Sequence, residues 1–475
     1  MTQLNRRRFL KTSAAFAAGT FAISGTKSSG AILGANERIR VAVAGLNGRG
    51  KSHMEGFGKL DGVEVAYVVD PDKRTWGSAI KRVSKHGKAP KAVQNIKKAL
   101  ADKSIDAISI ATPNHWHSLM AIWACQAGKD VYVEKPLSHN VHEGRVLVEA
   151  AAKNKRIVQH GTQSRSSQRW AQIADVIKAG TYGKLKVARG LCYKKRNSIK
   201  FQKPTTPPSE LDFNLWLGPA QEQPYHENLV HYNWHWFWDF GNGDLGNQGV
   251  HQMDIARWGI PGATLPKSVV SVGGRFGYKD QGQTANTQIC VYDYGDTQLI
   301  FEVRGLMPRN NITDLFHFED GTIRADGKFY RKNAGEGEPI PRTKSTRGPG
   351  GSNHFANFIA AVRSRKESDL NAPVLDGHYS SALCHLGNVS YQLGTETSFD
   401  QKTKVFAGNA AASETYAQMQ EHLKDRRVEL SETKCRVGRV LAFDAKTERF
   451  TDDKQANALL TRKYRSAFAV PEKIG

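Results

Sequence analysis

The sequence Glu37-Arg-Ile-Arg-Val-Ala-Val-Ala-Gly45-Leu-Asn-Gly-Arg-Gly50 decides the fold. It predicts an apolar strand, a glycine-rich turn and the start of a helix. The dinucleotide-binding fingerprint places glycine at the first, third and sixth positions of such a turn. Gly45 and Gly50 match the first and sixth positions, whereas Asn47 holds the third and Gly48 follows it. Because asparagine tolerates left-handed backbone angles better than most residues, the turn remains compatible with the fingerprint.

A second predicted strand, Val63–Asp70, strengthens this interpretation because it ends in an acid. In dinucleotide-binding domains a carboxylate at this place binds the hydroxyls of the adenosine ribose, which favours NAD over NADP. Lys73 and Arg74 follow closely, so a 2′-phosphate would also find basic partners there. The sequence therefore predicts NAD and leaves NADP open.

Two more predicted strands run into polar motifs. Ile105–Ala111 leads into Thr112-Pro113-Asn114-His115-Trp116-His117, and Asp130–Val133 leads into Glu134-Lys135-Pro136. Strands that alternate with helical stretches predict a doubly wound parallel sheet. Ligands of such sheets bind at the carboxyl ends of the strands, where all these motifs fall.

Three short motifs carry a specific resemblance: Thr112-Pro-Asn-x-x-His117, Ala124-x-x-x-Gly-Lys129 and Glu134-Lys-Pro136. Together they resemble the Gfo/Idh/MocA family, which includes glucose–fructose oxidoreductase and inositol dehydrogenase, and the resemblance covers residues 38 to about 395. It implies an NAD(P)-binding Rossmann domain followed by an α/β domain with a large, open, mostly antiparallel sheet. Most members are NAD(P)-dependent dehydrogenases of sugars and cyclitols, and a few cleave glycosides by oxidation and elimination.

The resemblance and the strand ends together predict the residues that bind the cofactor. Lys135 is expected beside the nicotinamide, where its ammonium group would donate to the reacting hydroxyl; an ion pair with Glu134 or another local acid is the alternative. The predicted cofactor-binding residues are Gly45, Asn47, Gly48, Arg49, Gly50, Asp70, Thr112, Pro113, Asn114, His117, Glu134, Lys135 and Gln163.

The second half of the chain alternates in the manner of β-strands joined by short turns, which indicates an antiparallel sheet suited to cover one side of a cleft. The predicted strands are Lys267–Phe276, Gln288–Tyr294, Gln298–Arg304 and Leu315–Phe318. Before them, the spacing from Asp244 onward fits a helix that places Asn247, His251 and Asp254 on one polar face. A histidine beside a carboxylate suits proton transfer near neutral pH, although a capped helix with a merely hydrogen-bonded His251 explains the spacing as well.

Members of the family often carry an Asp-x-Gly-x-His-x-x-Asp segment in which the histidine is the catalytic base and the first aspartate assists. His251 and Asp254 match that segment, whereas Asn247 replaces the first aspartate. An amide holds a substrate hydroxyl but does not stabilise an imidazolium as a carboxylate does, so Asp244 or Asp254 would have to take over. The predicted catalytic residues are Lys135, His251, Asn247 and Asp254.

Other polar and aromatic groups allow two interpretations each. Trp234, Trp236 and Trp238 suit either a saccharide platform or packing in a core or subunit interface. Lys194-Lys195-Arg196 would meet a substrate carboxylate or sulfate, or form a solvated turn. The pairs His115/His117 and His231/His235 have no convincing carboxylate or cysteine partner nearby, so no metal is predicted.

Composition sets the class of the chain. Its 475 residues, 39% hydrophobic and 24% charged, describe a folded globular protein, and five dispersed cysteines do not form a disulfide scaffold. No apolar run reaches the roughly 18 residues of a membrane-spanning helix. The net charge of +23 would attract anionic glycans or acidic sugars; solvated basic surfaces are the alternative explanation of this charge. No nucleic-acid recognition motif accompanies the charge, so no nucleic acid is expected as a partner.

The N-terminus predicts export. Arg6-Arg7-x-Phe9-Leu10-Lys11 and the weakly apolar stretch after it resemble a twin-arginine signal, whose translocon carries folded proteins; a disordered basic arm is the alternative. Residues 1–35 hold five basic and no acidic residues, so their removal lowers the charge from +23 to about +18. The expected location is periplasmic or extracellular. Because free NAD is scarce there, we expect a tightly bound cofactor that the enzyme itself restores.

The expected organisation follows. Residues 1–35 are the signal, 36–160 the Rossmann domain, 161–400 the substrate domain with helices near 352–395 packing back on the core, and 401–475 an extension that suits contact between subunits of a homo-oligomer. The expected activity is oxidation, by hydride transfer, of a hydroxyl-bearing carbon of a sugar, cyclitol or glycoside. The basic charge of the chain is compatible with a substrate that carries an anionic group. NAD-dependent glycoside cleavage and non-catalytic sugar binding are the alternatives.

Overall fold

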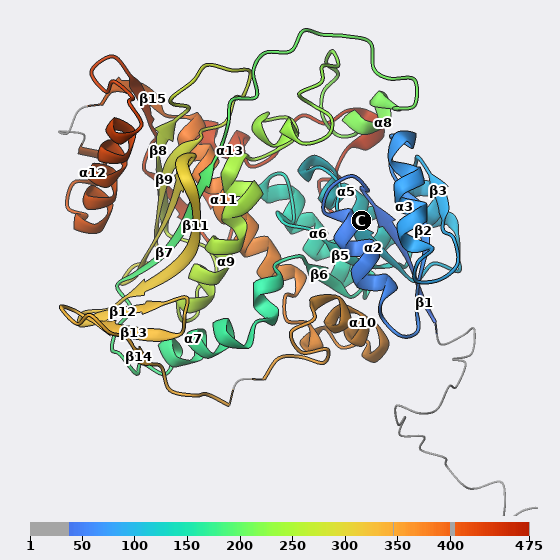
Figure 1. Cartoon of the computed structure of the whole chain (residues 1–475), viewed down its shortest axis with the longest axis horizontal. Helices are drawn as coiled ribbons and strands as arrows, with labels where there is room; N and C mark the ends of the chain where they lie inside the picture. Colours follow the sequence, from blue (N-terminus) through green and yellow to red (C-terminus); the bar gives the residue numbers. More distant parts are fainter. Residues whose placement is uncertain (1–37, 345, 400–403, 475) are drawn as a thin grey trace, which may run out of the picture. The chain divides into compact units, whose positions relative to one another are not determined.

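The computed structural model describes residues 38–344, 346–399 and 404–474 (Figure 1). The predicted signal, residues 1–35, lies outside the described residues. Residues 39–475 form one structural unit. No helix in the described ranges is long and apolar enough to cross a membrane.

The first domain is built on a parallel sheet with the strand order β3-β2-β1-β4-β5-β6. This order is that of a dinucleotide-binding Rossmann sheet, in which the chain reverses direction across the sheet between β1 and β4. The edge strands β3 and β6 have three residues each, too few to give a periodic pattern in the sequence. The strands are β1 Ile39–Ala44, β2 Val63–Val69, β3 Lys91–Val93, β4 Ala107–Ile110, β5 Asp130–Val133 and β6 Val158–His160.

Helices cover both faces of this sheet. On one face α5 and α6 pack with Ala44, Ile108 and Val131, and on the other α2 and α3 pack with Val41 and Val43. The second face also receives α10, from much later in the chain, through Phe355 and Phe358. The helices of this domain are α2 Gly50–Gly58, η2 Lys73–Thr75, α3 Trp76–Val83, α4 Ile96–Ala101, α5 Asn114–Gln126 and α6 Val141–Lys153.

The second domain is built on a sheet that has 12 strands within the described ranges, and its central order is β11-β7-β10-β9-β8. Of its described strand pairs only β7 and β10 run parallel; the others are antiparallel. The predicted fold class, a doubly wound parallel sheet followed by a large, mostly antiparallel one, is therefore confirmed. The strands are β7 Val187–Lys195, β8 Ser268–Gly274, β9 Thr287–Asp293, β10 Gln298–Arg304, β11 Leu306–His317, β12 Gly321–Arg324, β13 Lys328–Arg331, β14 Glu338–Pro339, β15 Thr395–Ser398, β16 Lys434–Val437, β17 Leu441–Asp444 and β18 Arg449–Phe450.

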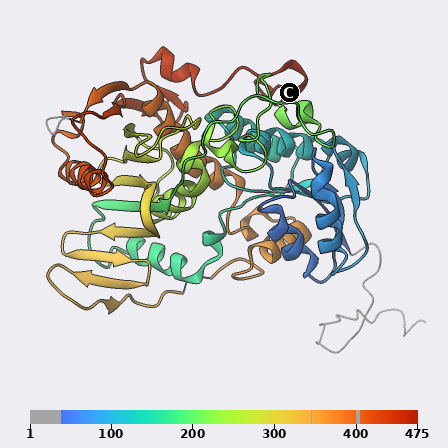
Figure 2. The ribbon, with the colours of Figure 1, turned by 45° about the horizontal axis from the view of Figure 1, so that its top comes forward.

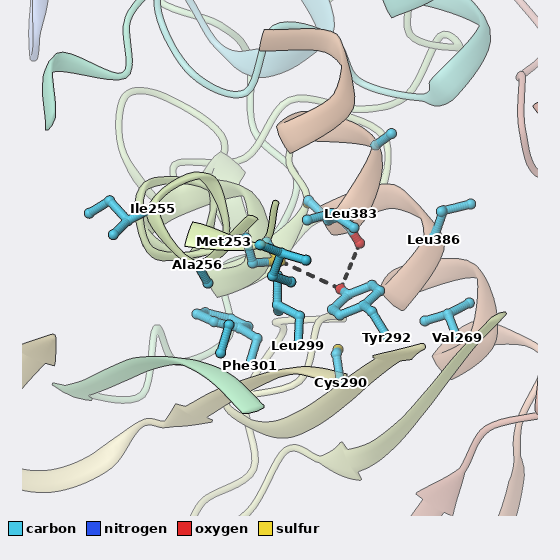
Figure 3. Packing of buried hydrophobic residues seen from close by; sticks show 14 of the residues in the cluster. Met253, Ile255, Ala256, Val269, Cys290, Tyr292, Leu299, Phe301, Leu383 and Leu386 are labelled. Atoms are coloured by element: carbon cyan, nitrogen blue, oxygen red, sulfur yellow. Dashed lines mark hydrogen bonds between the residues drawn. The ribbon is translucent and has the colours of Figure 1, made fainter. Parts of the chain in front are cut away.

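Alternate residues of these strands face two different cores. Tyr292 and Phe301 pack with Met253 of α9 and Leu383 of α11, and the Tyr292 hydroxyl donates to the Leu383 carbonyl at 2.7 Å (Figure 3). On the opposite face, Val291 and its neighbours pack against α12. The helices of this part are η3 Gln163–Ser166, α7 Gln168–Lys178, α8 Phe213–Leu217, η4 Asn233–Trp236, η5 Leu245–Gly249, α9 Val250–Gly259, α10 His354–Ser364, η6 Glu367–Asp369, α11 Val374–Gln392, η7 Lys404–Phe406, α12 Ala410–Asp425, α13 Lys454–Ala458 and η8 Ser466–Phe468.

Helix α11 joins the two domains, since it contacts α6 of the first and α9 and β8 of the second (Figures 1 and 2). The C-terminal tail, residues 460–474, returns to the first domain. Its Tyr464 hydroxyl donates to Glu143, Phe468 packs edge-on against Trp116 at 5.5 Å between ring centroids, and Val470 enters the core beside α5. The tail thus packs on its own chain; contact between subunits stays a prediction.

Candidate active site

A cavity of about 360 Å³ opens at the carboxyl ends of β1, β2, β4 and β5. Residues of both domains line it, as expected for a ligand site at the switch point of a doubly wound sheet. Of the predicted site residues, only Gly50 and Asp254 do not line it. Those that do are Gly45, Asn47, Gly48, Arg49, Asp70, Thr112, Pro113, Asn114, His117, Glu134, Lys135, Gln163, Asn247 and His251.

The glycine-rich turn fits a pyrophosphate. Gly45 has a φ of +84°, and a Cβ there would lie 2.4 Å from the Ala111 carbonyl oxygen. A Cβ on Gly50 would lie 1.8 Å from the Gly45 carbonyl oxygen, so Gly50 shapes the turn without facing the cavity. Gly48 has open space in front of it, and α2 begins beside it without a side-chain cap. A helix N-terminus behind an open glycine turn is a favourable place for phosphate.

Asp70 lies where a ribose carboxylate is needed. It is buried and accepts hydrogen bonds from the amides of Leu46, at 2.9 Å, and Asp72, at 3.0 Å; burial raises its pKa to about 6. Arg74, which the sequence left available for a 2′-phosphate, instead pairs with Asp72, and His231 donates to the same carboxylate at 2.8 Å. Arg74 is therefore engaged by Asp72 and Lys73 stays exposed, while the Asp70 carboxylate at the end of β2 supports NAD over NADP.

Glu134 connects the turn to the end of β5. It accepts from Arg49 at 2.8 Å and from His53 at 3.1 Å. Burial raises its pKa, but the hydrogen bond from His53 and the charges of Arg49 and Lys135 hold the pKa well below the usual range. Glu134 is thus an ionised group that fixes Arg49 over the turn.

Lys135 does not pair with Glu134, which was the alternative role predicted for it. Its Nζ donates to the main-chain oxygen of Asn247 and thereby crosses from one domain to the other. Burial lowers the pKa of Lys135 to about 8, against the opposing effect of Glu134. At neutral pH Lys135 is therefore an ammonium group placed at the cavity wall.

The segment that carries His251 differs from the continuous helix predicted from Asp244. Residues Leu245–Gly249 form a π-helical turn, and α9 starts only at Val250. Gly249 permits close packing, because a Cβ there would lie 2.6 Å from the Phe301 ring. π-Helical turns of this kind often occur at functional sites. The turn places the Asn247 carbonyl oxygen, rather than its side chain, on Lys135.

His251 lines the cavity, and neither of its ring nitrogens has a hydrogen-bond partner within the described ranges. Burial, with the nearby charge of Lys135, lowers its pKa to about 3. His251 is consequently neutral at pH 7, and one ring nitrogen has a lone pair available to a ligand. It shares this cavity with Lys135.

The two aspartates predicted to replace the missing carboxylate have other partners. Asp254 is buried, accepts from Arg165 Nε at 2.9 Å and Nη2 at 2.8 Å, and does not line the cavity. Asp244 does not cap the helix with its side chain but pairs with Arg196. Both carboxylates are therefore paired with arginines, and Asp254 follows His251 on α9 with its carboxylate on Arg165 rather than at the cavity.

The opposite wall of the cavity comes from a segment here called the cover, residues 196–243. Sequence reasoning missed most of its contribution, because nothing in its irregular sequence predicts which side chains face a ligand. Its lining residues are Leu215, Trp216, His231, Tyr232, Trp234 and His235. Of the three clustered tryptophans only Trp234 lines the cavity, stacked on His235 with centroids 3.6 Å apart; Trp236 is buried and Trp238 is half-buried.

The cover is attached to the first domain on one side and to the C-terminal tail on the other. Asp72 pairs with Leu211 in an isolated β-bridge, and Lys73 donates its amide to the Glu210 carbonyl at 3.1 Å. On the other side, Arg465 of the C-terminal tail donates to the Gly218 carbonyl at 2.7 Å, and Arg462 to the Asp239 carbonyl at 2.7 Å. The cover, which forms one wall of the cavity, is thus held by both the first domain and the tail.

The first predicted histidine pair, His115 and His117, has local partners. His115 lies 3.1 Å from the Trp216 carbonyl, and both ring nitrogens of His117 lie against carbonyl oxygens, of Thr112 and Pro136. Across the described ranges, no group of three or more His, Cys, Asp or Glu side chains is arranged to hold a metal ion.

This fold and site define the class of two-domain proteins that bind a dinucleotide between a Rossmann domain and an α/β domain. The model of an oxidoreductase family's NAD-binding Rossmann fold matches residues 39–162, and that of its C-terminal α/β domain matches residues 172–425. The chain belongs to this family, the Gfo/Idh/MocA oxidoreductases, and NAD is the cofactor of its Rossmann domain.

Individual relatives cover less of the chain. It is 28% identical over 204 residues to a glycosyl hydrolase family 109 protein of Shewanella pealeana, an alignment of 38% of this chain and 44% of that one. It is 27% identical over 206 residues to an alpha-N-acetylgalactosaminidase of Shewanella oneidensis, covering 39% and 45%. These alignments span less than half of the relatives' own length.

Solved structures share the fold. The WlbA dehydrogenase of Bordetella pertussis, in complex with NADH and UDP-GlcNAcA, aligns with a TM-score of 0.56 at 18% identity, over 74% of this chain and 96% of that one. Levoglucosan dehydrogenase in complex with NADH aligns with a TM-score of 0.55 at 16% identity, over 74% and 95%.

Proposed function

We propose that this protein is an NAD-dependent oxidoreductase that acts on a hydroxyl group of a sugar, cyclitol or glycoside. One observation carries the proposal: Lys135 and His251, from different domains, line the same cavity as the glycine-rich turn. The buried Thr112 hydroxyl and Gln163 carbonyl have no hydrogen-bond partner in the described part of the chain, which leaves polar groups for a bound cofactor. NAD, when bound, accepts a hydride from the carbon that bears the hydroxyl and can return it.

The residues of the chain supply binding and proton transfer. His251, neutral at pH 7, accepts the proton of the substrate hydroxyl at its unoccupied ring nitrogen. Lys135 donates a hydrogen bond to the same oxygen and stabilises the negative charge that develops there. Arg165 of η3 keeps Asp254 of α9 ionised, and this ion pair positions α9, the helix that carries His251.

Glycoside cleavage is the second candidate, favoured by the names of the relatives in the glycosyl hydrolase family 109. Oxidation of a ring hydroxyl makes the adjacent C–H acidic, so a base removes that proton and the aglycone leaves. Water then adds to the unsaturated ketone, and return of the hydride to the carbonyl carbon would restore the hydroxyl, so that the net reaction is hydrolysis. The same Lys135 and His251 would serve the oxidation in both reactions. The two candidates differ in their products rather than in their first step.

A panel of neutral sugars, acidic sugars and aryl glycosides tests the proposal. Mass spectrometry is expected to detect keto-sugars together with reduced nicotinamide if the net reaction is oxidation. Freed aglycones without net reduction of nicotinamide would select the glycosidase. An enzyme loaded with NAD that binds sugars from the panel but changes none of them would instead support the non-catalytic binding protein.

The cover and the twin-arginine motif support a retained cofactor. Because the cover forms one wall of the site and the tail holds the cover, we expect NAD to stay bound while the folded protein is exported, and the enzyme to restore it by a second half-reaction. Protein recovered from the periplasm or medium is expected to show the near-ultraviolet absorbance of reduced nicotinamide after incubation with substrate, released only on denaturation. Full exchange with added NAD within seconds would contradict retention, and protein found only in the cytoplasm would contradict export.

A further inference from the structure

The geometry points to a substrate that carries an anionic group, a carboxylate or sulfate on the sugar, which binds Lys194 beside Lys135. This inference rests on the proposed function, because it concerns the sugar that this site would oxidise. It assigns to Lys194 a role in substrate specificity.

Lys194 and Lys135 reach neighbouring residues of one backbone turn. Lys135 Nζ donates to the main-chain oxygen of Asn247, and Lys194 Nζ donates to the side-chain oxygen of Gln248 at 3.0 Å. Gln248 is held in turn by Gln252, whose side-chain oxygen accepts from it at 3.1 Å. Two ammonium groups, one two residues past the end of β5 and one from β7, therefore contact neighbouring residues of the π-helical turn, and of the two Lys135 lines the cavity.

The acidic groups around this turn are already neutralised. Glu134 pairs with Arg49, Asp244 with Arg196 and Asp254 with Arg165. Neither Lys135 nor Lys194 forms an ion pair with any carboxylate in the described ranges. The turn consequently has two positive charges in excess.

Asn247 explains the excess. The family segment described above has an aspartate at this position, and this chain has an amide. A carboxylate here would lie on the turn that both lysines contact and would compensate part of their charge. Without it the two ammonium groups repel each other. Burial is the largest cause of the lowered pKa of Lys135, and the charge of Lys194 lowers it further. An anionic substituent of the substrate would relieve that repulsion on binding.

Lys195 provides a matched comparison, because it is the exposed neighbour of Lys194 and carries the same charge. Long-range attraction by the basic surface would depend on both lysines about equally, whereas recognition at the site depends on Lys194 alone. The comparison therefore separates a specific contact from the general effect of net charge.

The test compares sugars that differ only in the anionic group, glucose with glucuronate and galactose with galacturonate and galactose 6-sulfate. Titration calorimetry and oxidation rates are measured on the NAD-loaded protein. The wild type is expected to prefer the anionic member of a pair by about 10–100-fold, the effect of a charged hydrogen bond. Lys194→Met is expected to remove this preference and to leave the neutral sugar unchanged, while Lys195→Met keeps it.

Equal binding of neutral and anionic sugars by the wild type would overturn the inference while leaving the proposed function intact. So would a Lys194→Met variant that loses neutral and anionic sugars alike. If that variant does not fold, Lys194→Gln is tested in its place. The wild-type KM is also measured at increasing salt concentration, and it should rise for the acidic sugar only. Binding of acidic sugars without any oxidation would instead overturn the proposed function and keep the anion site.

Discussion

His251→Ala is expected to lower the rate of sugar oxidation by about 10²–10⁴-fold, the range that a positioned general base contributes. The variant should still retain NAD, because His251 belongs to α9 of the second domain and is not part of the glycine-rich turn. It should also still bind sugar, since Lys135 and the cover remain. Single-turnover reduction of the bound cofactor measures the rate, and calorimetry measures sugar binding.

His86→Ala is the matched control, because His86 is bonded to Glu55 near the protein surface, outside the cavity. It is expected to keep the wild-type rate. If His251→Ala oxidised sugar at the wild-type rate, His251 would not be the base. If the substitution abolished sugar binding together with turnover, the residue would serve recognition rather than proton transfer.

The first domain could be predicted because its signal is local. A buried strand that ends in Gly45 and a second that ends in Asp70 place their last residues at one edge of a parallel sheet. The same rule brings Glu134 to this edge from a distant part of the sequence, and the structure finds it bonded to Arg49 of the turn. Periodicity and strand order together suffice for such contacts.

The second wall of the site could not be predicted in the same way. The cover, residues 196–243, lacks regular periodicity, and its Trp216 and His231 face the cavity because of long-range contacts with the tail and with Asp72. The π-helical turn was likewise missed, because it differs from an α-helix by one residue in its hydrogen bonding and leaves the same apolar pattern. Within this turn the main-chain oxygen of Asn247, and not its side chain, accepts the hydrogen bond from Lys135.

Asp254 shows where the resemblance to the family was insufficient. Its position in the motif predicts a catalytic contact, yet its carboxylate is fully used by Arg165 and by the Ser380 hydroxyl at 2.6 Å. A motif gives residue type and spacing, but the partner of a buried charge comes from another element, here η3. Oligomeric state and the twin-arginine signal are properties that no described contact tests, and they stay predictions.

Lys135→Met is expected to lower the oxidation rate by about 10²–10³-fold, the usual cost of removing one hydrogen-bond donor from a developing oxyanion. The loss should appear in kcat more than in KM, because the negative charge on the substrate oxygen develops only as the hydride leaves. Lys98→Met, on the exposed side of α4, carries the same charge change outside the cavity and should have no effect.

The pH dependence identifies the protonation state that Lys135 needs. Its pKa is lowered to about 8, so the donor ammonium is present below that pH and is lost above it. The wild-type rate should therefore fall as pH rises through about 8. The rate should not also fall between pH 7 and pH 5, because His251, with a pKa of about 3, stays neutral there. Lys135→Arg, whose side chain stays charged, should move this fall to higher pH even if its rate is lower. A rate that instead rises through pH 8 would make neutral Lys135 the base and assign His251 to substrate binding.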